Sequence, residues 1–313
     1  MRNFAPIVIF CYRRSIDKLI HALLQNKEAE NSDLIIFSDG FKSKSEKNDI
    51  LNNRKKLKKI IGFKSIEIIE STNNQGLSKS IINGVTYIFN KYDKAIILED
   101  DLIVSKYFLN YMNNALGYYE NNLDIWAISG FSPPLPCLKN YSAEVYFSYR
   151  TCSWGWATWK NRWNNSIWSM KFFKNFKKNK DLIKRFELGG NDLFKMLELY
   201  YLEKIDSWDI VWCYNQFINK AYSVFPKNSM TKNIGFNDGF ETHTSSDGEK
   251  WNVRLATSKI NCLNTSLNKE IISCFKEYHD LSFYTKVGYF LKKFGGYEIA
   301  KKLKNSVNFI KNI

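Results

Sequence analysis

Four short apolar runs in the first hundred residues, separated by segments with a helical pattern, most constrain the fold of this chain. The runs are residues 6–11, 34–38, 66–69 and 95–98. They are rich in Ile and Val and too short for helices, so we expect β-strands. The helical segments are residues 15–27, 43–61 and 77–90, and Ser15 is the expected cap of the first. Alternating strands and helices predict an α/β fold with a mainly parallel, doubly wound sheet flanked by helices.

Polar side chains follow three of these four predicted strands. They lie at residues 11–14, 38–40 and 99–101. In doubly wound sheets ligands bind beyond the carboxyl ends of the strands. We therefore expect a functional site at this edge, although polar loops after strands are common in proteins without one.

The acidic triplet after the fourth strand consists of Glu99, Asp100 and Asp101. Adjacent carboxylates repel one another unless a cation lies between them. Mg²⁺ and Mn²⁺ prefer oxygen ligands, often one or two carboxylates together with substrate phosphates. The triplet therefore predicts either a divalent-cation site for a nucleotide diphosphate or a solvated acidic turn.

The chain of 313 residues has 46 Lys and Arg against 31 Asp and Glu, a net charge of +15. This surplus favours a polyanionic neighbour such as nucleic acid, an anionic lipid surface or a phosphorylated ligand. Motifs of zinc fingers, RNA-recognition domains and basic zippers are missing from the sequence, so we do not expect nucleic acid. Much of the excess lies at residues 171–185 and in a Lys-rich, aromatic tail from 281, which favours an anionic membrane surface.

Cysteine spacing and apolar run length indicate the compartment. The six Cys residues form no C-x-x-C pair, which argues against a zinc or disulfide framework and favours reduced thiols. No run approaches the roughly 18 apolar residues of a membrane span. We expect a cytoplasmic protein, attached peripherally at the inner face of the cytoplasmic membrane.

Several motifs, in order along the chain, resemble the N-acetylglucosaminyltransferase I family of glycosyltransferases and related bacterial family 2-like sugar transferases. The clearest is LEDDLIVSKYFLNYM at 98–112, with a D-x-D-like acidic motif. The others are IFCYR (9–13), FSDG (37–40), YRT (149–151) and SWDIVW (207–212), and, for the bacterial branch, NQGLSKSIINGV (74–85), SWGWATWKNRW (153–163) and KNIGFNDGFETHT (232–244).

The resemblance implies a GT-A fold over residues 1–250, with a nucleotide-sugar half at 1–130 and an acceptor half at 131–250. Residues 251–313 would be a basic, helical C-terminal extension. It also implies an inverting, metal-dependent hexosyl- or N-acetylhexosaminyltransferase that uses a UDP-sugar. The expected acceptor is a hydroxyl of a surface glycan (capsule, O-antigen or lipooligosaccharide), free or lipid-linked. An inactive carbohydrate-binding or scaffold protein of the same fold is the alternative, and a nucleic-acid-binding protein is disfavoured.

The resemblance also assigns roles to residues at the strand ends. Asp101 would bind Mn²⁺, or Mg²⁺, held by the donor diphosphate, and Asp100 would contact the ribose or water on the metal. Cys11 and Arg13 would lie along the nucleotide. Asp39 would accept a hydrogen bond from the uracil N–H.

Three further segments carry candidate binding residues. Asn74, Gly76 and Lys79 follow the third strand and form either a donor-contacting loop or only a turn and helix entry. His243 lies in a polar loop. Some GT-A enzymes use a His from late in the chain as an additional metal ligand, so the resemblance implies this role for His243, and a His on the loop surface is the alternative. Trp154 and Trp156 flank Gly155 and could contact a sugar, since an indole ring suits its apolar face, or pack in an aromatic core.

Two carboxylates are candidates for the base that activates the acceptor hydroxyl, a role typically worth 10²–10⁴-fold in rate. Asp206 and Asp209 are three residues apart and would share one face of a helix. The family's base follows a Trp, which implies Asp209. The family has W-D-D-W where this chain has WDIVW, so Asp206 stays an alternative, and either residue could simply cap a helix.

Overall fold

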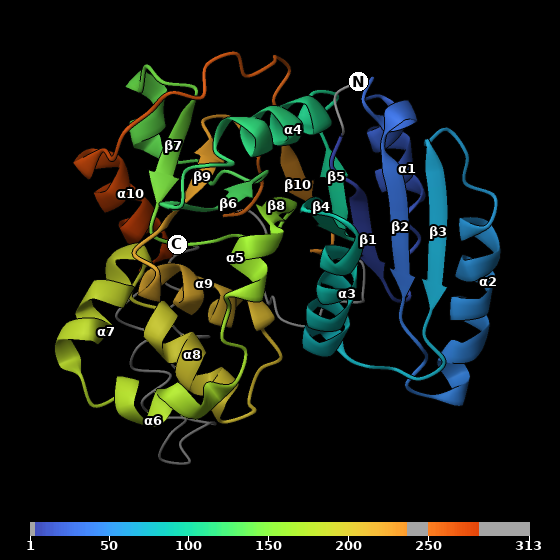
Figure 1. Ribbon diagram of the computed structural model, residues 1–313, viewed down its shortest axis with the longest axis horizontal. Helices are drawn as coiled ribbons and strands as arrows, with labels where there is room; N and C mark the ends of the chain where they lie inside the picture. The colour runs from blue at the N-terminus through green and yellow to red at the C-terminus, as the bar shows by residue number, and fades with distance from the viewer. Residues whose placement is uncertain (1–3, 237–249, 282–313) are drawn as a thin grey trace, which may run out of the picture.

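A mostly parallel eight-stranded sheet forms the centre of the computed structural model, which describes residues 4–236 and 250–281 (Figure 1). Its strand order is β3-β2-β1-β4-β8-β6-β9-β7. The strands are β1 (Ile7–Cys11), β2 (Asp33–Ser38), β3 (Ser65–Glu70), β4 (Lys94–Glu99), β6 (Ile125–Ser129), β7 (Val145–Ser148), β8 (Trp156–Trp159) and β9 (Tyr222–Pro226). Only β8 and β7 run antiparallel to their neighbours. The predicted α/β class with a mainly parallel sheet is confirmed.

The first four strands lie where the apolar runs predicted them. Every residue of β1 is buried, because β1 lies between β2 and β4 and helices cover both of its faces. The edge strand β3 has no fully buried residue, since it has only one neighbour in the sheet. Cys11 pairs with Ser38 and Phe10 pairs with Glu99, so this register brings the three polar strand ends side by side.

Helices cover both faces of the sheet (Figure 1). They are α1 (Asp17–Leu24), α2 (Lys47–Leu57), α3 (Leu77–Lys91), α4 (Phe108–Tyr118), α5 (Lys160–Asn164), α6 (Phe173–Phe176), α7 (Lys180–Phe186), α8 (Leu193–Tyr201), α9 (Trp208–Ile218) and α10 (Lys269–His279). The first helix is shorter than predicted. Ile16 is its N-cap, and Ser15 Oγ instead accepts a hydrogen bond from Asp17 N at 3.3 Å, so the expected cap is wrong by one position.

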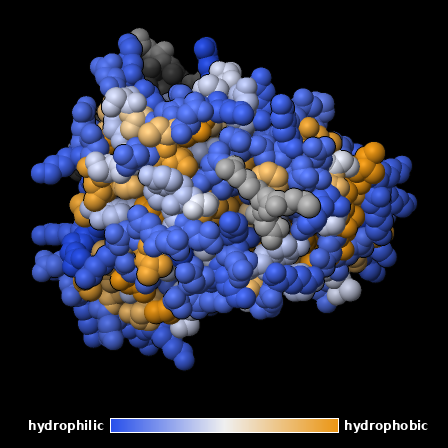
Figure 2. Space-filling view, turned by 45° about the horizontal axis from the view of Figure 1, so that its top comes forward, coloured by the Kyte–Doolittle hydropathy of each residue, from blue (hydrophilic) through white to orange (hydrophobic). Residues whose placement is uncertain are grey.

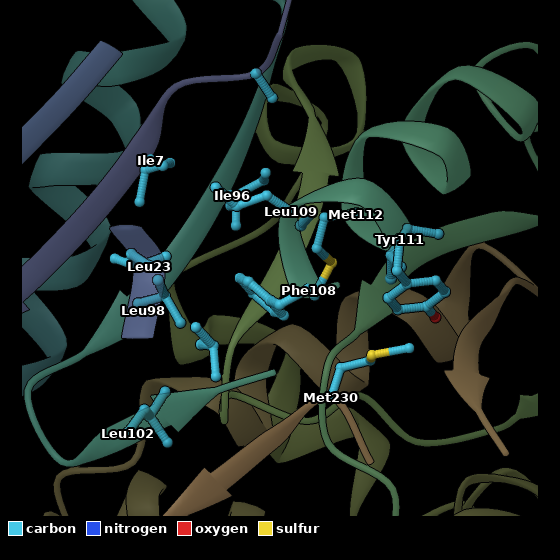
Figure 3. Packing of buried hydrophobic residues seen from close by; sticks show 14 of the residues in the cluster. Ile7, Leu23, Ile96, Leu98, Leu102, Phe108, Leu109, Tyr111, Met112 and Met230 are labelled. Atoms are coloured by element: carbon cyan, nitrogen blue, oxygen red, sulfur yellow. The ribbon is translucent and has the colours of Figure 1, made fainter. Parts of the chain in front are cut away.

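One core lies between the sheet and helices α1 and α4. Figure 3 shows Leu23 of α1 and Phe108 and Met112 of α4 close to Ile96 and Leu98 of the sheet. The opposite face packs against α3 and α9 through a second apolar cluster, which includes Ile81 and Val85 of α3 and Trp208 and Trp212 of α9. Alternate residues of β1 and β4 enter the two cores, as the pleat of a strand requires.

The helices α6, α7, α8 and α9 form a smaller helical body with its own apolar cluster. Phe173, Phe176 and Phe186 of α6 and α7 pack against Val211 and Tyr214 of α9. Helix α9 therefore has one face on the sheet and the other on the small helices. The basic stretch at residues 171–185 contains α6 and most of α7.

The described part of the predicted C-terminal extension, residues 251–281, packs against the sheet. Ala256 N donates to Ser229 O and Ser105 Oγ donates to Ala256 O, both at 2.7 Å. Phe275 of α10 stacks edge-on against Phe225 of β9. Residues 282–313, the rest of the predicted extension, lie outside the described residues. Within the described part of the chain, none of the helices is both long and apolar enough to span a bilayer.

Candidate functional site

The carboxyl ends of β1, β2 and β4 meet at one edge of the sheet, as the positions of the polar residues predicted. Glu99 ends β4, and Asp100 and Asp101 form the turn before the short strand β5 (Leu102–Val104). Strand β5 pairs with β10 (Thr231–Asn233), which brings a segment from late in the chain to the acidic triplet. The candidate site is therefore built from residues far apart in the sequence.

Asp100 is held by the segment that follows β1. Its Oδ2 accepts a hydrogen bond from Tyr12 N at 2.9 Å, and its Oδ1 lies 3.5 Å from Arg14 Nη1. Burial, followed by the charge of Asp101, raises the pKa of Asp100 to about 6. Burial and the charges of Asp101, Asp100 and Asp209 raise the pKa of Glu99 well above its usual range. The site thus holds several carboxylates in little water, an arrangement that a cation stabilises.

Asp101 is positioned by the end of β10. Its Oδ2 accepts a hydrogen bond from Asn233 Nδ2 at 2.9 Å, and its backbone O accepts one from Ile234 N at 2.8 Å. A side chain at Gly235 would place Cβ 2.9 Å from Asp101 Oδ2, so a larger residue there would displace the carboxylate. Sequence reasoning gave Asn233 and Gly235 no contact with Asp101, because the β5–β10 pairing that produces it is not visible in local patterns.

These residues fit a hard divalent cation that receives only part of its ligands from the protein. The chemistry of the donors, carboxylate oxygens of Asp101 and Asp100, suits Mn²⁺ or Mg²⁺. In residues 4–236 and 250–281, no group of three or more His, Cys, Asp or Glu side chains is arranged to hold a metal ion. A metal bound there would need further oxygen ligands, which a diphosphate and water can supply.

The segment after β1 places its two arginines differently. Arg13 forms ion pairs with Glu46 and Asp49 at the start of α2, at 3.4 and 3.2 Å, whereas Arg14 reaches Asp100. The sequence pointed to Arg13 on the nucleotide and gave Arg14 no role. Cys11 is buried, which raises the pKa of its thiol, so the thiol is protonated at neutral pH.

Asp39, at the end of β2, binds the loop that leads into α3. Its two carboxylate oxygens accept hydrogen bonds from the backbone N atoms of Gly40, Gln75 and Gly76 and from Asn74 Nδ2, at 2.8–3.2 Å. The side chain is only 7 % exposed. Gly76 is the N-cap of α3 with φ of +77°, and Lys79 is exposed in the first helical turn. Asp39 therefore fixes the loop that contains two of the predicted donor-binding residues.

Replacing Asp39 by Ala is expected to lower the free energy of unfolding by about 2 kcal/mol, because backbone N–H groups of the loop lose their acceptor. Urea denaturation measures this. The control is Asp33→Ala at the other end of β2, where the carboxylate accepts from Ser65 Oγ at a more exposed position and a loss below about 1 kcal/mol is expected. Equal losses in the two variants would contradict the assigned role of Asp39.

Asp206 and Asp209 lie in different environments. Asp206 Oδ2 accepts a weak hydrogen bond from Ser78 N at 3.4 Å, at the N-terminus of α3. Asp209 lies in the first turn of α9 and accepts a hydrogen bond from Ser207 Oγ. Its charge contributes to the raised pKa of Glu99, so Asp209 is the carboxylate that interacts with the acidic triplet.

Arg150 is a partly buried residue beside α9 whose function sequence reasoning did not assign. Its guanidinium forms an ion pair with Asp192 at 2.7 Å, and its pKa is raised by Asp192 and, more weakly, by Asp209. The next residue, Thr151, hydrogen-bonds through Oγ1 to Cys213 Sγ at 2.7 Å, one helical turn after Asp209. The motif YRT was visible in the sequence, but its ion-pair partner 42 residues away was not.

The two tryptophans predicted to contact sugar differ in location. Trp156 is 1 % exposed and packs against Trp208, Trp212 and Trp163 at ring distances of 5.1–5.9 Å, so a sugar cannot reach its ring and this expectation is wrong. Trp154 is partly buried, and its ring lies 5.5 Å from that of Trp251.

Trp154 contacts two residues that flank the segment beside Asp101. Its carbonyl accepts a hydrogen bond from Thr231 Oγ1 at 2.7 Å, and its ring contacts Phe236, the residue after Gly235. Trp154 therefore stays a candidate sugar contact. His243, the predicted additional metal ligand, lies outside the described residues.

No protein-family model matches the sequence, and neither does any curated protein. Among solved structures, the chain is similar to GalNAc-T7 with UDP, GalNAc and Mn²⁺ (14 % identity, TM-score 0.45, 77 % of this chain and 46 % of that one). It is also similar to the mannosyltransferase PcManGT from Pyrobaculum calidifontis in complex with GDP-Man and Mn²⁺ (9 % identity, TM-score 0.33, 50 % of this chain and 45 % of that one). A third similar structure is HddC from Yersinia pseudotuberculosis (12 % identity, TM-score 0.31, 50 % of this chain and 78 % of that one). The matches span less than half of the first two proteins. Similarity at this level does not identify a family.

Proposed function

We propose that this chain is a glycosyltransferase of the GT-A type that transfers a sugar from a UDP-sugar to an acceptor hydroxyl, with inversion and with Mn²⁺ or Mg²⁺. The observation that carries the proposal is the buried acidic triplet at the end of β4, with a further carboxylate, Asp209, close enough to raise the pKa of Glu99. The acidic triplet suits a metal–diphosphate, and Asp209 suits a base. Sugar transfer from a nucleotide needs both.

On the donor side, Asp101 would hold the metal and Asp100 would contact the ribose or water on the metal. A bound divalent cation would neutralise the charge that develops on the leaving diphosphate. Cys11 and Arg13 would border the nucleotide, with Asn74, Gly76 and Lys79 in the loop that Asp39 holds. Both oxygens of Asp39 already accept hydrogen bonds, so a uracil N–H would have to replace a donor such as Asn74 Nδ2.

On the acceptor side, Asp209 would accept the proton of the attacking hydroxyl, and Trp154 would contact a sugar ring. Asp209 is favoured over Asp206 because its charge contributes to the raised pKa of Glu99, whereas Asp206 is bound at the start of α3. His243 would be an additional metal ligand.

The proposed acceptor is a surface glycan, either free or attached to a lipid at the inner face of the cytoplasmic membrane. The net charge of +15 supports an anionic partner of this kind. We place the lysine-rich tail from residue 281 at the same surface. Nucleic acid is not part of the proposal.

A panel of UDP-sugars and GDP-sugars, each with and without Mn²⁺, tests the function. A UDP-sugar at a hundred times its Kd is expected to stabilise the protein by about 2.7 kcal/mol, or roughly 5 °C in Tm, only when Mn²⁺ is present. Release of UDP, measured in the same samples, reports turnover. Stabilisation without UDP release would favour a carbohydrate-binding protein, and no stabilisation by any UDP-sugar would contradict the proposal.

A further inference from the structure

The segment that contains α6 and α7 carries many exposed positive charges. Residues 171–187 contain seven Lys and Arg against two Asp and Glu. All seven cations are exposed: Lys171, Lys174, Lys177, Lys178, Lys180, Lys184 and Arg185. Within residues 4–236 and 250–281, none of the seven forms an ion pair with a carboxylate. We call these seven residues the basic surface.

The phenylalanine side chains of α6 and α7 are buried, which leaves the basic surface exposed. Phe173, Phe176 and Phe186 are buried against α8 and α9, so the cationic side chains are left on the outside. Exposed apolar residues adjoin the segment at each end, Ile167 at 45 % and Leu188 at 39 % exposure. Figure 2 shows that hydrophilic residues cover most of one face of the molecule and that hydrophobic residues emerge there in patches. Cations beside exposed apolar side chains are typical of surfaces that lie on anionic lipid.

The helices α6 and α7 pack against α9, the helix that carries Asp209. Figure 1 places α6 and α7 at one end of the molecule, with α9 between them and the sheet. The segment after α7 reaches Arg150, since a Cβ on Gly189 would lie 3.1 Å from Arg150 Cβ. Asp209 lies in the first turn of α9. The helix that carries Asp209 is therefore the one against which α6 and α7 pack, through residues that include Val211 and Tyr214.

We propose that α6 and α7 form a docking surface for an anionic lipid bilayer, which presents a lipid-linked acceptor to Asp209. The charge complementarity of the basic surface selects the bilayer as partner, and the neighbouring apolar side chains favour lipid over a purely polar polyanion. The identification of the bound lipid as an acceptor rests on the proposed function. The docking itself does not.

Vesicle sedimentation with the full chain tests the docking. The test variant is K174E/K184E, with one charge reversal in each helix. The matched control is K55E/K59E, which makes the same change in net charge at exposed lysines near the end of α2. Helix α2 lies at the opposite end of the molecule from α6 and α7 (Figure 1).

The wild-type protein is expected to sediment with vesicles of phosphatidylglycerol and phosphatidylcholine and not with phosphatidylcholine alone. K174E/K184E is expected to bind the anionic vesicles at least about thirtyfold more weakly, because each basic residue near such a surface contributes about 1 kcal/mol, or about fivefold in affinity. K55E/K59E is expected to stay within about threefold of the wild type.

Four results would overturn the docking surface. The first is that the wild type does not bind anionic vesicles, and the second is that the α2 control loses as much binding as K174E/K184E. The third is that K174E/K184E binds the vesicles as well as the wild type does. The fourth is that the wild type binds single-stranded RNA more tightly than vesicles and that K174E/K184E no longer binds the RNA. UDP release without vesicles is expected to be equal in all three proteins. If the wild type releases no UDP from any UDP-sugar, the proposed function fails while the vesicle result stands.

Discussion

Replacing Asp101 by Asn is expected to lower kcat/KM for sugar transfer by at least about a thousandfold. The amide keeps the size of the carboxylate but loses the charge that would hold a divalent cation, and stabilisation of a leaving group by a metal is worth several kcal/mol. The hydrogen bond from Asn233 Nδ2 can still reach the amide oxygen, so the fold around β10 should be retained. Initial rates of UDP release and the Mn²⁺-dependent rise in Tm measure the two effects.

Asp124→Asn is the control for this variant. Asp124 is exposed just before β6, and its replacement is expected to change neither the rate nor the response to Mn²⁺. Transfer by the Asp101 variant at near the wild-type rate, or wild-type transfer that EDTA leaves unchanged, would show that the acidic triplet does not act through a metal. Loss of the native Tm without Mn²⁺ would instead show a structural role for Asp101.

Replacing Asp209 by Asn is expected to lower kcat by about 10²–10⁴-fold while the donor still binds. The amide cannot accept the proton of the acceptor hydroxyl, but the metal and nucleotide residues at the ends of β1, β2 and β4 are untouched. The measurements are kcat with saturating donor and acceptor, and the Kd of the UDP-sugar from thermal stabilisation.

Asp206→Asn is the matched comparison, because it makes the same chemical change three residues earlier. Asp206 binds at the N-terminus of α3, where loss of its charge is expected to cost about 0.3–1 kcal/mol of stability and less than tenfold in kcat. The opposite pattern, with the larger rate loss in Asp206→Asn, would make Asp206 the base. Equal and small rate losses would exclude both carboxylates from that role.

The strands at the site could be predicted because their signals are local. Each apolar run of β1, β2, β3 and β4 lies within six residues, and the parallel arrangement follows from the helices between them. The acidic triplet could be placed at the end of β4 for the same reason. The parallel register then brings Cys11, Ser38 and Glu99 to one edge without further information.

The contacts of individual side chains could not be predicted, because they depend on residues distant in sequence. Arg13 and Arg14 are neighbours, yet one binds α2 and the other Asp100, as the conformation of the turn decides. Trp156 is buried because its strand lies between β4 and β6 and its ring meets α9. Apart from the one donated by Gly40 N, the hydrogen bonds to Asp39 come from a loop 35–37 residues later, and a strand-end carboxylate alone does not reveal them.

Strand β8 has a mechanical consequence for the proposed reaction. It pairs with β4 on one side and with β6 on the other, so the strand that ends at the acidic triplet and the strands of the predicted acceptor half belong to one continuous hydrogen-bonded sheet. Hinge closure between the halves, a common way to exclude water from an active site, would have to break this ladder. If the chain is the proposed glycosyltransferase, we expect substrate entry and product release to rely on movements of loops at the carboxyl edge, because the sheet holds the ends of β4 and β6 together.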